Sequence, residues 1–244
     1  MHFRLHPARI LIPLGAALLV AYAVLWLRVT PLEVGRSDFT STYVGATLFR
    51  TGQAASLYDE SVQSALHSEL IAPDTEGNLP YVDAPLASAI AAPITLLPLD
   101  TAYRIWSLLQ LALLAAAVVL AVRAAPWPSR TRPQWKLAAS LLALAGCGTM
   151  VQLLQAQWGP VTALGLALAY QRWRAGKPAQ GAMALVVAAG IAKPHLAVGL
   201  LIFLIGWRER RVLLGALAGG AGVLAANLLL SLIHISEPTR QAEI

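Results

Sequence analysis

Asp38 is the first residue of the sequence whose type and position suit chemistry. It follows the first long apolar segment and lies in the run Ser37-Asp38-Phe39-Thr40-Ser41-Thr42-Tyr43. A carboxylate within hydrogen-bond reach of a hydroxyl can take its proton while a new bond forms at that oxygen. The same position also suits an acid that caps a helix N-terminus or offsets its dipole. The residues alone leave both interpretations open.

A second candidate is the triplet Lys193-Pro194-His195, which interrupts an otherwise apolar run from 181 to 205. A lysine at the centre of a bilayer costs about 2.5–3.5 kcal/mol on insertion scales, so it must pair, reach the interface or face a polar cavity. Lys193 could therefore bind a phosphate. It could equally belong to a simple turn between two half-length helices. His195 is a candidate substrate contact, although a histidine here is more often structural.

Amide and aromatic side chains provide candidates for binding a sugar, because amides bond hydroxyls and aromatic rings stack on sugar rings. Gln157 and Trp158 lie in a polar break at 155–160, and Tyr43 and Tyr81 lie in the polar region nearer the N-terminus. Tryptophan and tyrosine also belong at membrane interfaces by default. These residues are therefore candidate substrate contacts with an interfacial alternative.

Asp83 is a second acid of the polar region. With Asp38 it could hold Mg²⁺ or Mn²⁺ together with a substrate phosphate, or it could bond a sugar hydroxyl. We expect instead a solvated acid in a turn, and so no metal site and no cofactor, with a divalent cation as the alternative. The sequence also lacks a P-loop, a dinucleotide fingerprint and zinc-ligand spacing. The single Cys147 can form no internal disulfide and is expected to be a small core residue.

The elements that position these residues must be membrane helices. Apolar residues make up 57% of the chain and charged residues 12%, against about 25% charged in soluble domains. The mean hydropathy is +0.63. Helices satisfy their own backbone hydrogen bonds, which lipid cannot do. We therefore predict an all-α, polytopic membrane protein with about six to eight membrane segments. They are drawn from the apolar runs 10–27, 86–97, 101–122, 137–154, 161–170, 181–205 and 212–230.

The distribution of charge predicts the topology. Eight of the twelve acids but only three of the eighteen bases lie in 28–85. The positive-inside rule therefore places this loop outside the cytoplasm. Short basic connections at 123–136, 172–177 and 208–211 are expected to face anionic lipid in the cytoplasm, and no nucleic acid is expected. Strict alternation would put 123–136 outside if 86–97 crosses the membrane. A segment 86–97 that enters and returns would remove this conflict.

The outer loop is predicted to contain two short amphipathic helices. Helical spacing of apolar residues indicates one helix at 39–50, with Ser37 as its N-cap and Gly52 as its stop. A second helix is expected from 56 or 57 to 70, with acids on its polar face.

The C-terminal tail does not continue the pattern of apolar spans. Residues 231–244 resemble the translation of a common sequencing adapter. We therefore expect residues 1–230 to be the N-terminal part of a membrane domain and 231–244 to be an artefactual tail.

Several short motifs occur in a fixed order along the chain, namely Ser37-Asp38-Phe39, Tyr43, Gly52, Leu57-Tyr58-Asp59, Tyr81, Pro85-Leu86, Pro93, Leu97-Pro98, Ala102, Trp106, Gln157 and Lys193-Pro194. Their order and spacing resemble glycosyltransferase family 87. This sequence departs from the family pattern at two motifs. Where the family usually has Tyr-Pro-Pro-Leu, it has Asp83-Ala84-Pro85-Leu86, and where the family usually has Gly-Gln, it has Ala156-Gln157. The resemblance implies a multi-spanning GT-C fold, polyprenyl-phosphate sugars as donors, often mannose, and Asp38 as the catalytic acid of the first outer loop.

Together these inferences predict a glycosyltransferase of the bacterial inner membrane. It would move a hexose, with mannose as the first candidate, from a polyprenyl phosphate to a lipid or glycan acceptor on the extracytoplasmic face. The alternative is a transporter or flippase of a lipid-linked or small polar substrate, with Lys193 on its path. The expected base is Asp38, and the expected substrate contacts are Lys193, Tyr43, Tyr81, Gln157 and His195.

Overall fold

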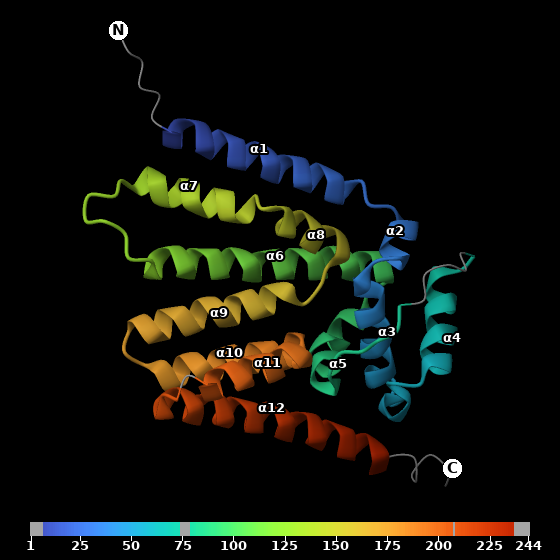
Figure 1. The fold of residues 1–244 in the computed structure, drawn as a ribbon. Coiled ribbons are helices and arrows are strands. Elements are labelled where there is room, and N and C mark those ends of the chain that lie inside the picture. The colour runs from blue at the N-terminus through green and yellow to red at the C-terminus, as the bar shows by residue number, and fades with distance from the viewer. Residues whose placement is uncertain (1–6, 74–78, 207, 237–244) are drawn as a thin grey trace.

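A computed structural model describes residues 7–73, 79–206 and 208–236, and this part of the chain contains helices and no strands, which confirms the all-α prediction. The helices pack side by side as a bundle of roughly parallel and antiparallel rods, with a group of short helices across one end (Figure 1). They are α1 (Pro7–Leu27), α2 (Pro31–Gly35), α3 (Asp38–Arg50), η1 (Ala54–Ser56), α4 (Glu60–Ile71), α5 (Pro85–Ala91), η2 (Ala92–Leu96), α6 (Leu99–Ala124), α7 (Pro133–Leu144), α8 (Cys147–Gln155), α9 (Gly159–Arg174), α10 (Pro178–Ala192), α11 (Pro194–Gly206) and α12 (Arg210–Ser236).

Among the described residues, three helices are long and apolar enough to cross a membrane, namely α1, α6 and α12. The pair α7 and α8 passes the same test together but is bent by 48°, so it gives up to one more span. The predicted number of six to eight membrane segments is therefore not confirmed. Shorter apolar helices at Pro85–Leu96 and Pro178–Ala192 pack against the longer ones.

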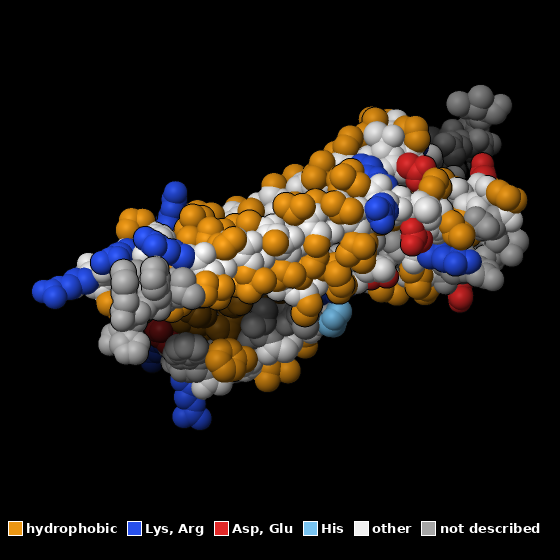
Figure 2. Space-filling model, turned by 90° about the horizontal axis from the view of Figure 1, so that it is seen from above, with side chains coloured by type: hydrophobic (Ala, Val, Ile, Leu, Met, Phe, Trp, Pro, Cys, Tyr) orange, Lys and Arg blue, Asp and Glu red, His pale blue; other side chains and the backbone are white. Residues whose placement is uncertain are grey.

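Charge separates the two ends of the bundle. The turns that join α6 to α7, α9 to α10, and α11 to α12 lie at one end, which we call the basic end (Figure 1). The helices α2, α3, α4 and α5 lie at the opposite, acidic end, where most of the Asp and Glu side chains of the visible face gather (Figure 2). A band of hydrophobic side chains lies between the two ends (Figure 2). This pattern is that of a membrane protein with an apolar belt.

The structure removes the conflict over residues 86–97. This segment forms α5 and η2, which stay at the acidic end in contact with α3 (Figure 1). Because it does not run to the basic end, α6 starts at the acidic end and carries the chain back to the basic end. The basic connection 123–136 therefore lies with the other basic turns.

The helices at the acidic end start and stop largely where their capping residues predict. Ser37 is the N-cap of α3, and Gly52 follows its C-terminus with a φ of +76°, which glycine adopts without strain. The second helix starts later than expected, at Glu60. The carboxylate of Asp59 accepts hydrogen bonds from the backbone N–H groups of Ser61 (2.9 Å) and Val62 (3.3 Å) and so caps α4.

Aromatic side chains form the core that joins the acidic end to the long helices. The ring centroid of Phe39 on α3 lies 5.9 Å from that of Tyr103 and 6.3 Å from that of Trp106, both on α6. The neighbouring Arg104 donates hydrogen bonds to the carbonyl oxygen of Trp26, in the last turn of α1, and to that of Val29, just beyond the helix. A cation there satisfies carbonyls that a helix end leaves unpaired. The junction between α1, α3 and α6 is therefore fixed.

Two further expectations concern Cys147 and the tail. The prediction that Cys147 is a core residue is wrong, because it lies at the bend between α7 and α8 and is exposed. Helix α12 continues past 230 to Ser236, and the rest of the predicted tail, 237–244, lies outside the described residues.

Candidate active site

A cavity of about 170 Å³ at the acidic end brings together residues that are far apart in the sequence. We call it the Asp38 pocket. Its walls come from the start of α3, from residues 79–83, from the break between α8 and α9, and from the break between α10 and α11. Its volume is smaller than the roughly 300–1,000 Å³ of a pocket that encloses a drug-sized ligand. The lining residues are Asp38, Ser41, Thr42, Leu79, Pro80, Val82, Asp83, Gln157, Trp158 and Lys193.

Asp38 is the first residue of α3 and is half-buried. The cap position belongs to Ser37, whose hydroxyl donates to the carbonyl oxygen of Val34 (2.7 Å) and accepts no capping hydrogen bond from the N–H groups of the helix. The carboxylate of Asp38 instead accepts a hydrogen bond from the amide of Gln157. Its own backbone N–H donates to Oε1 of Gln155 (3.1 Å). The Asp38 carboxylate is therefore held from the α8–α9 break, at the pocket wall.

The α8–α9 break is a tightly bonded turn that aims Gln155 and Gln157 at α3. Ala156 lies between them in a left-handed conformation with a φ of 50°, at the position where the family that the sequence resembles usually has glycine. Its carbonyl accepts from the indole N–H of Trp106 (3.0 Å), and the Gln152 side chain donates to the carbonyl of Gln157 (2.6 Å). These bonds account for a turn that would otherwise disfavour a residue with a Cβ.

Lys193 is the connecting residue between α10, which ends at Ala192, and α11, which starts at Pro194. The predicted turn is present, and the half-buried Lys193 also lines the Asp38 pocket. Among the described residues, nothing accepts a hydrogen bond from its ammonium group. An ammonium group in this position is free to bind an anion that enters the pocket. His195 follows at the start of α11, is exposed, and is not among the lining residues.

Asp83 is not the solvated turn acid that we expected. It is half-buried and lines the pocket with Asp38 and Lys193. Burial raises the pKa of its carboxyl group above the usual value, while Lys193 and His195 lower it and Asp38 raises it further. Asp83 is the titratable residue of the pocket that sequence reasoning undervalued.

Tyr43 and Tyr81, two predicted substrate contacts, lie behind the pocket and not in its lining. The Tyr43 hydroxyl donates to the carbonyl oxygen of Leu97 (2.9 Å), and the side chain is 7% exposed. The Tyr81 hydroxyl donates to the carbonyl of Ala84 (2.9 Å), and the side chain is 2% exposed. Burial raises the pKa of both hydroxyls. Both residues therefore support the wall of the pocket.

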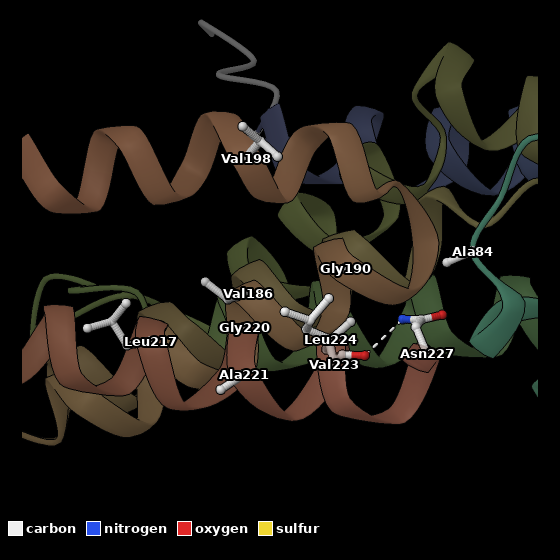
Figure 3. Close-up of a pocket in the computed structure, with 10 residues that line it drawn as sticks. All are labelled: Ala84, Val186, Gly190, Val198, Leu217, Gly220, Ala221, Val223, Leu224 and Asn227. Carbon is white, nitrogen blue, oxygen red and sulfur yellow. Dashed lines mark hydrogen bonds between the residues drawn. The ribbon is translucent and has the colours of Figure 1, made fainter. Parts of the chain in front are cut away.

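An apolar groove of about 530 Å³ lies between α10, α11 and α12 (Figure 3). Ala84 and Asn227 lie together at one end of it (Figure 3), and Ala84 directly follows the pocket residue Asp83 in the chain. The groove therefore starts beside the Asp38 pocket. Its lining is Ala84, Val186, Gly190, Val198, Leu217, Gly220, Ala221, Val223, Leu224 and Asn227.

Asn227 is a positioning residue that sequence reasoning missed. Its Oδ1 accepts a hydrogen bond from the backbone N–H of Leu86 (2.9 Å), and its Nδ2 donates to the carbonyl of Val223 (2.9 Å; Figure 3). It thereby ties α12 to the start of α5. A signal was available, because Asn227 is the only polar residue in the apolar run 212–230.

The chemistry of this arrangement is that of group transfer with charge on the leaving group. It combines a held carboxylate, an amide that fixes it and, near Asp83, an ammonium group whose hydrogen bonds no described residue accepts, next to an apolar groove. Within the described residues, no group of three or more His, Cys, Asp or Glu side chains could hold a metal ion. Among the described residues that line the pocket, Asp38 and Asp83 are the acids.

Comparison with known proteins assigns the chain to a family. Residues 81–237 match the family model of glycosyltransferase family 87. The matched residues include Asp83, Gln157, Lys193 and Asn227, and Asp38 precedes them. Neither curated proteins nor solved structures gave a significant match. Since the match covers more than half of the chain, the protein belongs to glycosyltransferase family 87 and is a membrane glycosyltransferase.

Proposed function

We propose that the Asp38 pocket transfers a hexose from a polyprenyl phosphate to the hydroxyl of an acceptor, with Asp38 as the general base. One observation carries the proposal. Asp38, Gln157 and Lys193 come from three segments that are far apart in the sequence, yet they line a single pocket. Asp38 and Gln157 alone are 119 positions apart.

The chemical step follows from what each side chain can do. The Asp38 carboxylate takes the proton of the acceptor hydroxyl while the oxygen of that hydroxyl attacks the anomeric carbon of the sugar. The bond from this carbon to the phosphate oxygen breaks, and its electron pair leaves on the polyprenyl phosphate. A one-step displacement of this kind inverts the configuration at the anomeric carbon.

Lys193 and Gln157 support that step in different ways. The Lys193 ammonium stabilises the negative charge that develops on the departing phosphate. Because phosphate is already a good leaving group, no second protein acid has to protonate it, in contrast to glycoside hydrolysis. Gln157 donates to the Asp38 carboxylate and holds it in the orientation that the acceptor hydroxyl needs.

The apolar groove supports a lipid-linked donor. A polyprenyl chain carries many branched apolar carbons, and nine of the ten lining residues of the groove are apolar or glycine. With the phosphate at Lys193, the first isoprene units would leave the pocket past Ala84 and lie between α10, α11 and α12 (Figure 3). A nucleotide sugar would instead need polar contacts along this path.

The charge separation supports an orientation. The basic end would face the cytoplasm and the acidic end the outside of a bacterial inner membrane, so transfer would take place at the extracytoplasmic face. Mannose is the first candidate for the hexose, and a lipid or glycan is the expected acceptor.

The proposal is tested with the purified protein in liposomes. Polyprenyl-phosphate mannose with a labelled sugar is added with candidate lipid and glycan acceptors, and new glycosidic products are analysed. We expect a labelled glycoside with inverted anomeric configuration, and no product from a nucleotide sugar. Movement of the label across the vesicle without a new glycosidic bond would instead show a transporter and would refute the proposal.

A further inference from the structure

The segment that carries Asp83 has no regular secondary structure, yet it is anchored on both sides of this residue. Before it, the backbone N–H of Tyr81 donates to Oε1 of Gln63 (2.7 Å), and Nε2 of Gln63 donates back to the carbonyl of Tyr81 (3.3 Å). Gln63 is 3% exposed and lies on α4. A reciprocal pair of this kind substitutes for the backbone pairing that the segment lacks.

The anchoring continues at Asp83 itself and after it. The Tyr58 hydroxyl donates to the backbone carbonyl of Asp83 (2.9 Å). The Tyr81 hydroxyl donates to the carbonyl of Ala84 (2.9 Å), and Asn227 accepts from the N–H of Leu86. The backbone around Asp83 is therefore fixed by side chains from several elements, and its side chain enters the pocket from a rigid support.

The Asp83 carboxylate has no hydrogen-bond partner among the described residues. It is half-buried, and its raised pKa has burial as the largest cause. A partly desolvated carboxylate without donors opposes folding, because a buried polar group costs free energy unless it is hydrogen-bonded. A carboxylate can only accept hydrogen bonds, and a sugar ring offers adjacent hydroxyl donors. The missing donors are thus those that a bound sugar would supply.

We propose that Asp83 is a specificity-determining residue that accepts hydrogen bonds from hydroxyl groups of the transferred sugar. This inference rests on the proposed function. The pocket then has one group for each part of the reaction, with the phosphate at Lys193, the acceptor hydroxyl at Asp38 and the sugar hydroxyls at Asp83. All three side chains line the same cavity of about 170 Å³.

A divalent cation between Asp38 and Asp83 is the competing use of this carboxylate. The Lys193 ammonium opposes it, because it lies close enough to lower the pKa of Asp83 and would repel a further cation. Gln157 already donates to the Asp38 carboxylate, which removes one of the acceptor positions that a cation would need. The same features favour neutral hydroxyl donors as the partners of Asp83.

The test pairs a variant of Asp83 with donors that lack single hydroxyls. The protein in liposomes is assayed with polyprenyl-phosphate mannose, its glucose epimer, and its 2-, 3-, 4- and 6-deoxy analogues. For Asp83→Asn we expect kcat/KM with the best hexose donor to fall by about 10- to 100-fold, since one charge-assisted hydrogen bond is lost. With the deoxy analogue that lacks the hydroxyl bound by Asp83, the same variant should change kcat/KM by less than about threefold.

The control variant is Glu60→Gln, which removes an exposed acid in the first turn of α4, outside the pocket lining. It should leave kcat/KM unchanged for every donor. Folding is followed by thermal unfolding in detergent, where Asp83→Asn should be at least as stable as the natural protein at pH 7.

Three results would overturn the inference, and they are distinguishable. An equal fall for all donors, deoxy analogues included, would show that Asp83 does not read a sugar hydroxyl. Loss of wild-type activity in EDTA, restored by Mg²⁺ with a requirement that Asp83→Asn shifts, would show a cation site. Absence of transfer by the wild-type protein from any polyprenyl-phosphate hexose would refute the proposed function itself, and the inference with it.

Discussion

Gly45 on α3 gives a direct test of how the pocket wall is built. A Cβ at this position would lie 2.5, 2.6 and 2.7 Å from three ring carbons of Tyr81, where carbon atoms pack at about 3.5–4.0 Å. Gly45→Ala therefore forces the ring to move by about 1 Å. The backbone N–H of Tyr81 is hydrogen-bonded to Gln63, and its hydroxyl is hydrogen-bonded to the carbonyl of Ala84. The ring can therefore move only with the segment that carries Asp83.

The net effect on stability combines two terms. Overpacking in a filled core costs about 1–3 kcal/mol. Replacing glycine by alanine inside a helix contributes about 1 kcal/mol in the opposite direction. We therefore expect Gly45→Ala to lower the free energy of unfolding by about 0–2 kcal/mol. The effect on transfer should be larger, because a displacement of about 1 Å in a catalytic site can cost roughly 100-fold in rate.

The assay compares Gly45→Ala with Gly148→Ala on α8, where a Cβ would meet nothing within 4 Å. Thermal unfolding in detergent and initial rates of sugar transfer are measured for both variants. Gly148→Ala should be as stable and active as the natural protein, or slightly more stable. If Gly45→Ala matched it in both measurements, the rigid wall built on Gly45 and Tyr81 would be refuted.

Three further predictions concern the pocket and its supports. Burial raises the pKa of Asp83 in the folded protein, so ionisation of Asp83 opposes folding as the pH rises above its unfolded pKa of about 4. Asp83→Asn should therefore raise the melting temperature at pH 7 but not at pH 4. An equal effect at both pH values would contradict this prediction. Lys193→Met should lower kcat/KM for the lipid-linked donor by about 10- to 100-fold and Lys193→Arg by less, and equal rates for both would exclude a role for the charge. Asn227→Leu should lower the free energy of unfolding by about 1–3 kcal/mol in denaturant titration, because the N–H of Leu86 loses its acceptor, and an unchanged midpoint would argue against the tie.

The parts of the fold that depend on local chemistry could be predicted from the sequence. Helix α3 is marked by Ser37 before it and by Gly52 after it, and both signals act within a turn of the helix end. The break at Lys193 is likewise local, because a lysine followed by proline cannot continue an apolar helix without cost. The association of Asp38 with Gln157 and Lys193 needed the family resemblance, since spacing in the sequence says nothing about their distance in space.

The sequence alone does not place residues whose environment is set by distant partners. Asp83 reads as a turn acid, but Gln63 and Asn227, which lie 18 and 141 positions from the backbone groups that they bond, fix its segment against the pocket. Tyr43 and Tyr81 read as substrate contacts, but each hydroxyl finds a backbone carbonyl inside the fold. An aromatic residue type alone does not tell whether its polar group faces a ligand or the chain.

The role of Asp38 is the central claim, and Asp38→Asn tests it most directly. Asparagine keeps the shape of the side chain and an oxygen that can accept from Gln157, but it cannot take a proton from the acceptor. In single-turnover transfer from a polyprenyl-phosphate hexose in liposomes, we expect the rate to fall by about 100- to 10,000-fold with donor binding and thermal stability retained. Transfer at the wild-type rate by Asp38→Asn would contradict the claim that Asp38 is the catalytic base.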